Sequence, residues 1–236
     1  MAQDAWQDAR HFGPPTSGTL MTINASTIRC ENDKRLYDNL LQDPLVTKVN
    51  EQIAKAEEDN PFSLRRRLLA TSVRLSPRMS PKLHKMAAEC VDKLELDTPL
   101  ELYAFASPQY NAMCFKPEDG RLFLMFASSL LEGFDDSELR FVVGHELGHH
   151  AYQHHDVPIG YILRGKSRPD PRLALSLFTW SRYAEISADR AGAHCAQDLE
   201  SVSRALFKLC LLYTSPSPRD CNEYRVCRLL LEKGGG

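Results

Sequence analysis

Two histidines four residues apart, with a glutamate directly after the first, mark the part of this 236-residue chain that could carry out chemistry. They are His145 and His149, and the glutamate is Glu146. On an α-helix, residues four apart lie on one face, so both imidazoles can reach a single metal ion about 2 Å away. Glu146 then lies beside the ion, where its carboxylate can act as a general base on metal-bound water. The pattern predicts a hydrolytic site that holds one zinc ion per chain.

The neighbours of these residues indicate that the helix is buried. Most positions around the histidines are apolar, namely Phe141, Val142, Val143, Leu147 and Ala151. Buried imidazole and carboxylate groups need polar partners, and a metal ion supplies one. This context favours a metal site over a surface helix whose polar residues have this spacing by chance.

A catalytic zinc ion usually has three protein ligands and one open position, and we expect Glu185 to be the third ligand. Glu185 belongs to the helical-looking segment 181–192, which is far enough from His149 to run antiparallel to the first helix. Asp189 follows one turn later on the same face, where it could accept the other ring N–H of a ligand histidine. Taken alone, these two carboxylates are more typical of an exposed acidic helix face.

Three other histidines lie nearer in the chain and compete for the role of third ligand. His150 points about 100° round the helix from His149. His154 and His155 lie beyond the same turn. We interpret all three as polar residues at the end of the helix.

Three motifs in the same order resemble the zinc metallopeptidases of family 48, which include HtpX and the CAAX prenyl proteases. The similarity covers roughly residues 103–207. The motifs are Tyr110-Asn111-Ala112, then Gly144 to His149, then Ser181-Arg182 followed by Glu185, Ala188-Asp189 and Gly192. The resemblance implies that His145, His149 and Glu185 are the zinc ligands. It also implies that Glu146 is the general base and that Asp189 supports a ligand histidine.

A change of period predicts a small sheet before the histidine helix. Alternating residues indicate a strand at 100–105 and a hairpin formed by 112–115 and 122–126. In the resembled family this sheet lies over the metal helix and binds substrate as an added strand, so that Asn111 and Ala112 would line the substrate cleft. Asn111 could equally be a turn residue ahead of the strand. The expected fold class is α+β, a mainly helical zincin-like domain with a small antiparallel sheet over the metal-binding helix.

The elements that must position the site are mostly helices. Apolar periodicity predicts helices at 33–58, broken at Pro44, and at 61–75. A further helix opens at Ser80-Pro81. Acidic residues from Asp135 supply the N-cap of the metal helix, which should end near His155. The polar segment 160–171 is interpreted as a loop beside the cleft.

We divide the chain into four segments on this basis. A flexible leader (1–30) precedes an N-terminal helical segment (31–98) and a metallopeptidase core (99–209). The tail (210–236) resembles a translated sequencing adapter, so we predict that it is non-native and that the core is truncated.

Composition limits the class of protein. With 43% hydrophobic residues, the chain can bury one good-sized core. The net charge of only −2 gives no indication of a nucleic-acid partner. No stretch approaches the ~18 consecutive apolar residues of a membrane span, although membrane association of the complete protein stays open. The N-terminus lacks the features of a signal peptide, and the cysteines outside the tail form no C-x-x-C motif. We expect a cytoplasmic location.

These observations predict a zinc-dependent metalloendopeptidase that acts on a protein or peptide substrate. Two alternatives stay open. One is a zinc hydrolase with the same site that does not cleave peptides. The other is a catalytically incomplete fragment that binds metal or peptide without turnover.

Overall fold

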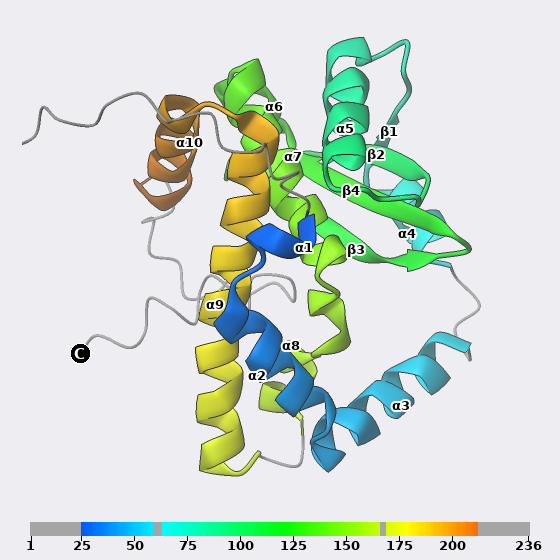
Figure 1. Cartoon of the computed structure of the whole chain (residues 1–236). Coiled ribbons are helices and arrows are strands. Elements are labelled where there is room, and N and C mark those ends of the chain that lie inside the picture. Colours follow the sequence, from blue (N-terminus) through cyan, green and yellow to red (C-terminus); the bar gives the residue numbers. More distant parts are fainter. Residues whose placement is uncertain (1–24, 59–62, 166–168, 212–236) are drawn as a thin grey trace, which may run out of the picture.

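The fold is organised around two helices packed against each other, α7 (Asp136–Ala151) and α9 (Pro171–Ala196) (Figure 1). The computed structural model describes residues 25–58, 63–165 and 169–211. Helices predominate and a four-stranded sheet lies beside α7, so the predicted α+β class is confirmed. The tail from 212 onward and the leader up to residue 24 lie outside the described residues.

The remaining elements follow one another along the chain. The helices are α1 (Ala25–Ile28), α2 (Glu31–Leu41), α3 (Pro44–Glu58), α4 (Leu64–Thr71), α5 (Pro81–Lys93), α6 (Ser128–Gly133), α8 (Ile159–Arg164) and α10 (Leu199–Leu211), with a 3-10 helix, η1 (His154–Asp156). The strands are β1 (Val73–Leu75), β2 (Leu100–Phe105), β3 (Ala112–Glu118) and β4 (Arg121–Ala127).

The sheet is mixed, which corrects the expectation of an antiparallel one. Its order is β1-β2-β4-β3, and β2 pairs with β4 in parallel while the other two pairings are antiparallel. The predicted hairpin of β3 and β4 is present, but β4 and not β3 lies next to β2. Because β4 runs opposite to β3, it runs in the same direction as β2.

Alternating residues of β4 divide the sheet between two cores. Leu122, Leu124 and Phe126 are buried together with apolar residues of α5 and α7. Phe123 points to the other face, where Leu68 of α4 covers it. This alternation is what a strand buried on both faces requires. The strand order places β3 at the edge of the sheet next to α7.

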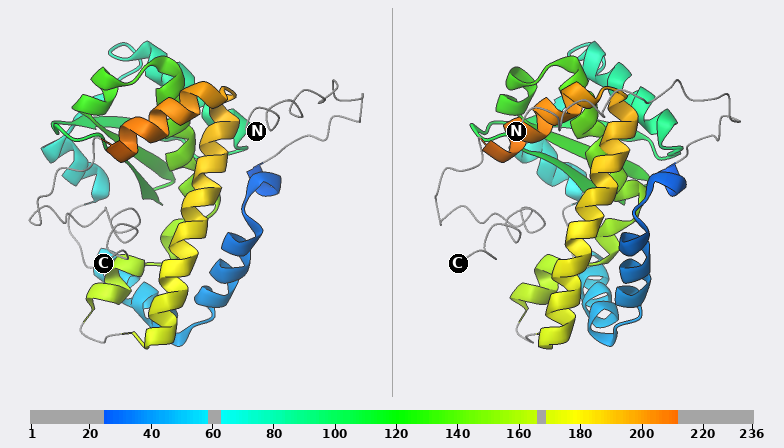
Figure 2. Two further views of the ribbon diagram at one scale, coloured as in Figure 1. Left: turned by 90° about the vertical axis from the view of Figure 1, so that its left-hand side faces the viewer. Right: turned by 60° about the vertical axis from the view of Figure 1, so that its left-hand side comes forward.

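A separate core lies at the other end of α9. Trp180 and Leu177 on the first half of α9 pack there with Tyr37 and Leu40 of α2 and Ile162 of α8. Both views of Figure 2 show α1 and α2 alongside α9, on a different side from the sheet. The first two helices, α1 and α2, therefore pack against α9.

Four boundaries differ from those expected. Residues 73–75 form β1 in place of the last turn of a helix, since they pair with β2. Segment 160–171 is not simply a loop, because α8 occupies its first part. The metal helix ends at Ala151. The end of the predicted leader, residues 25–30, packs against the fold through hydrogen bonds from the Tyr152 hydroxyl to the Ala25 carbonyl (2.9 Å) and from the Cys30 amide to Ser187 Oγ (3.0 Å).

The N-cap expected at the start of α7 is confirmed. Asp135 Oδ1 accepts hydrogen bonds from the amides of Ser137 and Glu138, each at 2.9 Å. Glu138 returns the interaction by accepting from the Asp135 amide at 2.8 Å. This capping box satisfies amides that would otherwise lack partners at the helix end.

Glycines allow α7 and α9 to approach closely. A Cβ atom added at Gly144 would lie 2.6 Å from Cys195 Cβ, and one added at Gly148 would lie 2.7 Å from Ala191 Cβ. On the opposite helix, a Cβ at Gly192 would lie 2.7 Å from the Phe141 carbonyl oxygen. Gly148 lies one turn after Gly144 on α7 but faces Ala191, one turn before Cys195 on α9, so the two helices are antiparallel as predicted.

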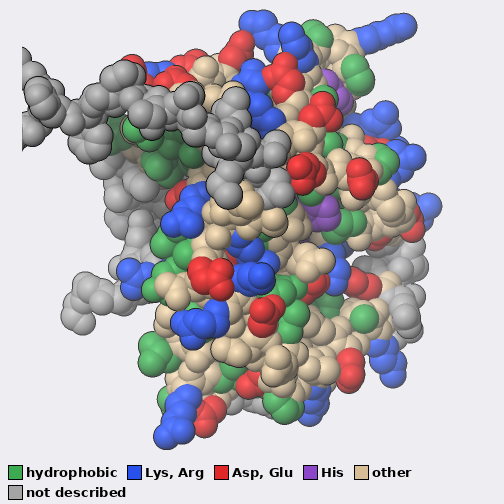
Figure 3. Space-filling model, viewed as in Figure 1, with side chains coloured by type: hydrophobic (Ala, Val, Ile, Leu, Met, Phe, Trp, Pro, Cys, Tyr) green, Lys and Arg blue, Asp and Glu red, His purple; other side chains and the backbone are tan. Residues whose placement is uncertain are grey.

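Charges of both signs are intermixed over the face shown in Figure 3, in keeping with the small net charge of −2. Within the described part of the chain, no helix combines the length and the apolar character needed to cross a bilayer.

The close approach of α7 and α9 predicts how the free energy of unfolding changes when a methyl group is added to one helix and removed from the other. Gly148→Ala should lower the free energy of unfolding by about 1–3 kcal/mol, because its new methyl overlaps Ala191. Adding Ala191→Gly should recover part of that loss, since the overlapping atom is removed. Urea denaturation of both single variants and the double variant measures the coupling. Additive losses would contradict a contact between these two positions.

His155 predicts a pH dependence of stability. Its Nε2 atom is buried without a hydrogen-bond partner among the described residues, and burial lowers the pKa of this imidazole to about 4, helped by the nearby His154 and His150. The unfolded chain binds a proton near pH 6.5 and the folded chain does not, so stability should fall as pH falls from 6.5 to 4. His155→Gln should remove this part of the pH dependence, which amounts to at most about 3 kcal/mol in the free energy of unfolding. Parallel stability curves for the two proteins would exclude this explanation.

Candidate metal centre

The structure brings His145, His149 and Glu185 together, with one potential ligand atom of each within 4.8 Å of the others. The Nε2 atoms of the two histidines are 3.2 Å apart. Glu185 faces them from α9, with oxygens 3.5 Å from His145 Nε2 and 3.7 Å from His149 Nε2. Residues 36 positions or more apart in the chain thus share one site because α7 and α9 pack antiparallel.

These separations fit a tetrahedral zinc ion. Bonds of 2.0–2.1 Å at tetrahedral angles put neighbouring ligand atoms about 3.3 Å apart. The two Nε2 atoms are 3.2 Å apart, and the carboxylate of Glu185 approaches them with Oε2 at 3.5 Å from His145 and Oε1 at 3.7 Å from His149, all close to that value. Two imidazoles and a carboxylate are also a usual donor set for zinc. The residues present therefore suit the ion.

Asp189 holds His145 in the required orientation. Its Oδ1 atom lies 2.9 Å from His145 Nδ1. An ionised carboxylate only accepts hydrogen bonds, so Nδ1 carries the proton and the lone pair of Nε2 faces the site. Burial lowers the pKa of His145, but the hydrogen bond to Asp189 and the charges of Glu185 and Glu146 outweigh it and raise the pKa. The surroundings therefore favour a positive charge at this position.

His149 has a different support, which the sequence interpretation missed. Its Nδ1 atom lies 2.9 Å from Nδ1 of His154, and Nε2 of His154 lies 3.1 Å from Oδ2 of Asp33. His154 was expected to be a polar residue at the helix end, but it is only 6% exposed. The turn after α7 bends back into η1, which directs the ring inward under His149.

Asp33 is a fully buried carboxylate on α2. Besides His154, it accepts hydrogen bonds from Trp180 Nε1 (3.0 Å) and Ser187 Oγ (2.7 Å), and Arg29 binds it at 2.8 Å. Burial raises the pKa of this carboxyl, but the hydrogen bonds from His154, Arg29 and Ser187 lower it by a larger amount. The pKa therefore lies well below its ordinary value. Asp33 therefore remains ionised.

Glu146 lies between α7 and the edge of the sheet. Its Oε2 atom accepts a hydrogen bond from the Cys114 amide of β3 at 3.0 Å. Its carboxylate thus faces the edge strand as well as the histidines. Asn111 and Ala112, the residues expected to bind substrate, line one small hollow together with His145 and Glu146. Asn111 also accepts a backbone hydrogen bond from Ala127, which closes the sheet next to this hollow.

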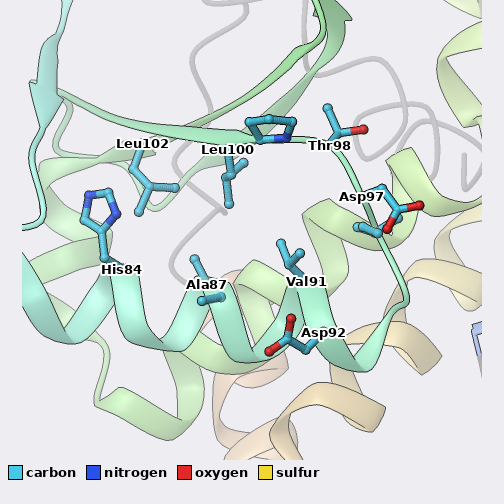
Figure 4. Close-up of a pocket in the computed structure, with 11 residues that line it drawn as sticks. His84, Ala87, Val91, Asp92, Asp97, Thr98, Leu100 and Leu102 are labelled. Atoms are coloured by element: carbon cyan, nitrogen blue, oxygen red, sulfur yellow. The ribbon is translucent and has the colours of Figure 1, made fainter.

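A larger cavity, of about 330 Å³, lies elsewhere, between α5 and the start of β2 (Figure 4). His84, Ala87 and Val91 of α5 line one wall, and Leu100 and Leu102 line the other. It shares no residue with the metal cluster. The cavity is therefore separate from the site described above.

Comparison with known proteins identifies the same region. Residues 77–164 match the model of peptidase family M48. The chain is also 31% identical over 150 residues to the plastoglobule-localized metallopeptidase 48, chloroplastic, of Arabidopsis thaliana. That alignment covers 60% of this chain and 43% of the relative, so the chain spans less than half of the relative's length. No solved structure gives a significant match.

The family match contains His145, Glu146 and His149, whereas Glu185, Asp189 and Asp33 lie outside it. The resemblance seen in the motifs is thus confirmed by the family model and by the relative. Residues 77–164 thus resemble peptidase family M48, and the similar protein of Arabidopsis thaliana is a metallopeptidase.

Proposed function

We propose that this protein is a zinc-dependent metalloendopeptidase. The observation that carries the proposal is the convergence of His145 Nε2, His149 Nε2 and the Glu185 carboxylate, one oxygen near each histidine, at separations suited to one zinc ion. The histidine atoms that face away from this point are held by other side chains, at 2.9 Å in each case. Such support is typical of metal-binding histidines.

Zinc, when bound, supplies a Lewis acid that lowers the pKa of water towards neutrality and polarises a carbonyl group. Glu146 moves the proton in this scheme. Its carboxylate accepts a proton from the attacking water and returns it to the nitrogen of the leaving amine. The hydrogen bond from the Cys114 amide keeps this carboxylate turned towards β3, the side from which a peptide would arrive.

The edge strand supports a peptide as the substrate. Among the described strands β3 pairs with β4 alone, so its other edge offers backbone groups to an added strand. Asn111 and Ala112, at the start of β3, adjoin the hollow that contains Glu146. A peptide paired with β3 would place its backbone next to the general base. We therefore assign substrate binding to this edge.

The incomplete-fragment alternative is kept because the chain spans only 43% of its relative's length. Under that alternative zinc binds but no peptide is cleaved. The active peptidase and the incomplete fragment would both bind zinc, and they differ only in whether peptides are cleaved. Cleavage assays, with a substitution of Glu146, distinguish them.

Glu146→Gln should abolish peptide cleavage and leave zinc binding intact. The amide cannot accept the proton of water, so the rate of casein cleavage should fall by roughly 10²–10⁴-fold. Zinc content by atomic emission and casein cleavage should be measured on the same preparations. Chelation should also remove activity from the wild-type protein, and added zinc should restore it.

Glu132→Gln is the matched control, because this glutamate is exposed on α6. It should retain full activity. Cleavage by Glu146→Gln at the wild-type rate would refute the assignment of the base. Zinc binding by the wild type without cleavage of any unfolded protein would establish the incomplete fragment.

Glu185→Gln should weaken zinc binding by roughly 100-fold or more, since it removes a charged ligand. Competition with a chromophoric chelator measures the affinity. His150→Ala should have little effect, as its ring is not in the cluster. Equal affinities of Glu185→Gln and the wild type would mean that a different residue is the third ligand.

A further inference from the structure

We propose that Asp33 and His154 are positioning residues of the metal centre, which act through His149. The proposal rests on the zinc site proposed above. It adds to that site a row of three hydrogen-bonded side chains, Asp33, His154 and His149, that starts with a buried carboxylate on the N-terminal helix α2.

The proton positions in this chain have one consistent arrangement. A zinc ligand at His149 Nε2 requires that Nδ1 of the same ring carry the proton. His154 Nδ1, 2.9 Å away, must then accept that proton with its lone pair. The proton of neutral His154 therefore sits on Nε2, from which it is donated to Asp33 at 3.1 Å.

The other partners of Asp33 determine which ring nitrogen of His154 carries the proton. Trp180, Ser187 and Arg29 all donate hydrogen bonds to its carboxylate. An ionised carboxylate only accepts, so His154 can bind it only through an N–H group. Asp33 thus selects the tautomer of His154, and His154 in turn selects the tautomer of His149 that can bind a metal.

The chain also fixes the position of the ligand ring. Edge-to-face contacts stack His149 on His154 and His154 on Trp180, with centroids 5.0 and 5.7 Å apart. His154 cannot turn away without leaving Asp33, which is fully buried. The two ligand histidines are therefore supported from opposite sides, His145 by Asp189 of α9 and His149 by α2 through His154.

The test compares zinc affinities of the full chain by chelator competition, together with the melting temperature of each metal-free protein. His154→Leu and Asp33→Asn should each lower zinc affinity by roughly 10–100-fold. His154→Asn should lose less than His154→Leu, because its side-chain oxygen can still accept the His149 proton. The double variant with Asp33→Asn and His154→Leu should bind zinc about as His154→Leu does, since both changes break one chain.

Tyr37→Phe is the matched control. Tyr37 lies on α2 one turn after Asp33. Its hydroxyl binds Asp156 (3.3 Å) and does not take part in the hydrogen bonds that join Asp33, His154 and His149. This variant tests docking of α2 alone and should keep the wild-type zinc affinity. His154→Asn and Asp33→Asn carry the comparison if His154→Leu does not fold.

Unchanged zinc affinity in Asp33→Asn and in the His154 variants would overturn the inference, whatever happens to the melting temperature. A loss of equal size in Tyr37→Phe would overturn it as well, because general packing of α2 would then explain the effect. Wild-type protein that binds no zinc would overturn the proposed function and this inference with it.

Discussion

The close contact between α7 and α9 is the constraint on which the rest of the structure depends. At Gly144, Gly148 and Gly192 there is no room for a methyl group without displacing the opposite helix. This proximity brings the carboxylate of Glu185 on α9 within 3.7 Å of both His145 and His149 of α7. With wider spacing, Glu185 could not share a zinc ion with them, since zinc bonds are only about 2 Å long. The same glycines that appear in the sequence motifs thus set the dimensions of the metal centre.

Much of this arrangement could be predicted because its determinants are local. The four-residue spacing of His145 and His149 places them on one helix face whatever surrounds the helix. Asp135 and Glu138 form their capping box within one turn. The Asp-Gly pair after β3 adopts positive φ angles at both positions, as a tight hairpin turn requires. Each of these features depends on neighbours in the chain, so the sequence pattern was sufficient.

The parts that could not be predicted depend on contacts between distant segments. Whether β3 or β4 pairs with β2 is decided by packing of the hairpin on α5 and α7, and the alternation of residues is the same in both cases. His154 looked like a polar residue at a helix end because nothing near it in the chain suggests a buried partner. That partner, Asp33, lies 121 positions earlier in a helix whose sequence is largely polar. A buried aspartate and an exposed one are indistinguishable until the helix is docked.

The burial of Asp33 links folding of the N-terminal helices to the metal centre. An ionised carboxylate loses much of its hydration on burial, a cost that only several good hydrogen bonds can offset. Three of its donors, Trp180, Ser187 and His154, belong to elements around α7 and α9. They lack this acceptor until α2 packs against α9, and α2 in turn lacks a partner for its carboxylate until they are in place. Docking of α2 and orientation of His154 should therefore occur together. The proposed metal centre is thus completed by a segment that carries none of His145, Glu146 and His149.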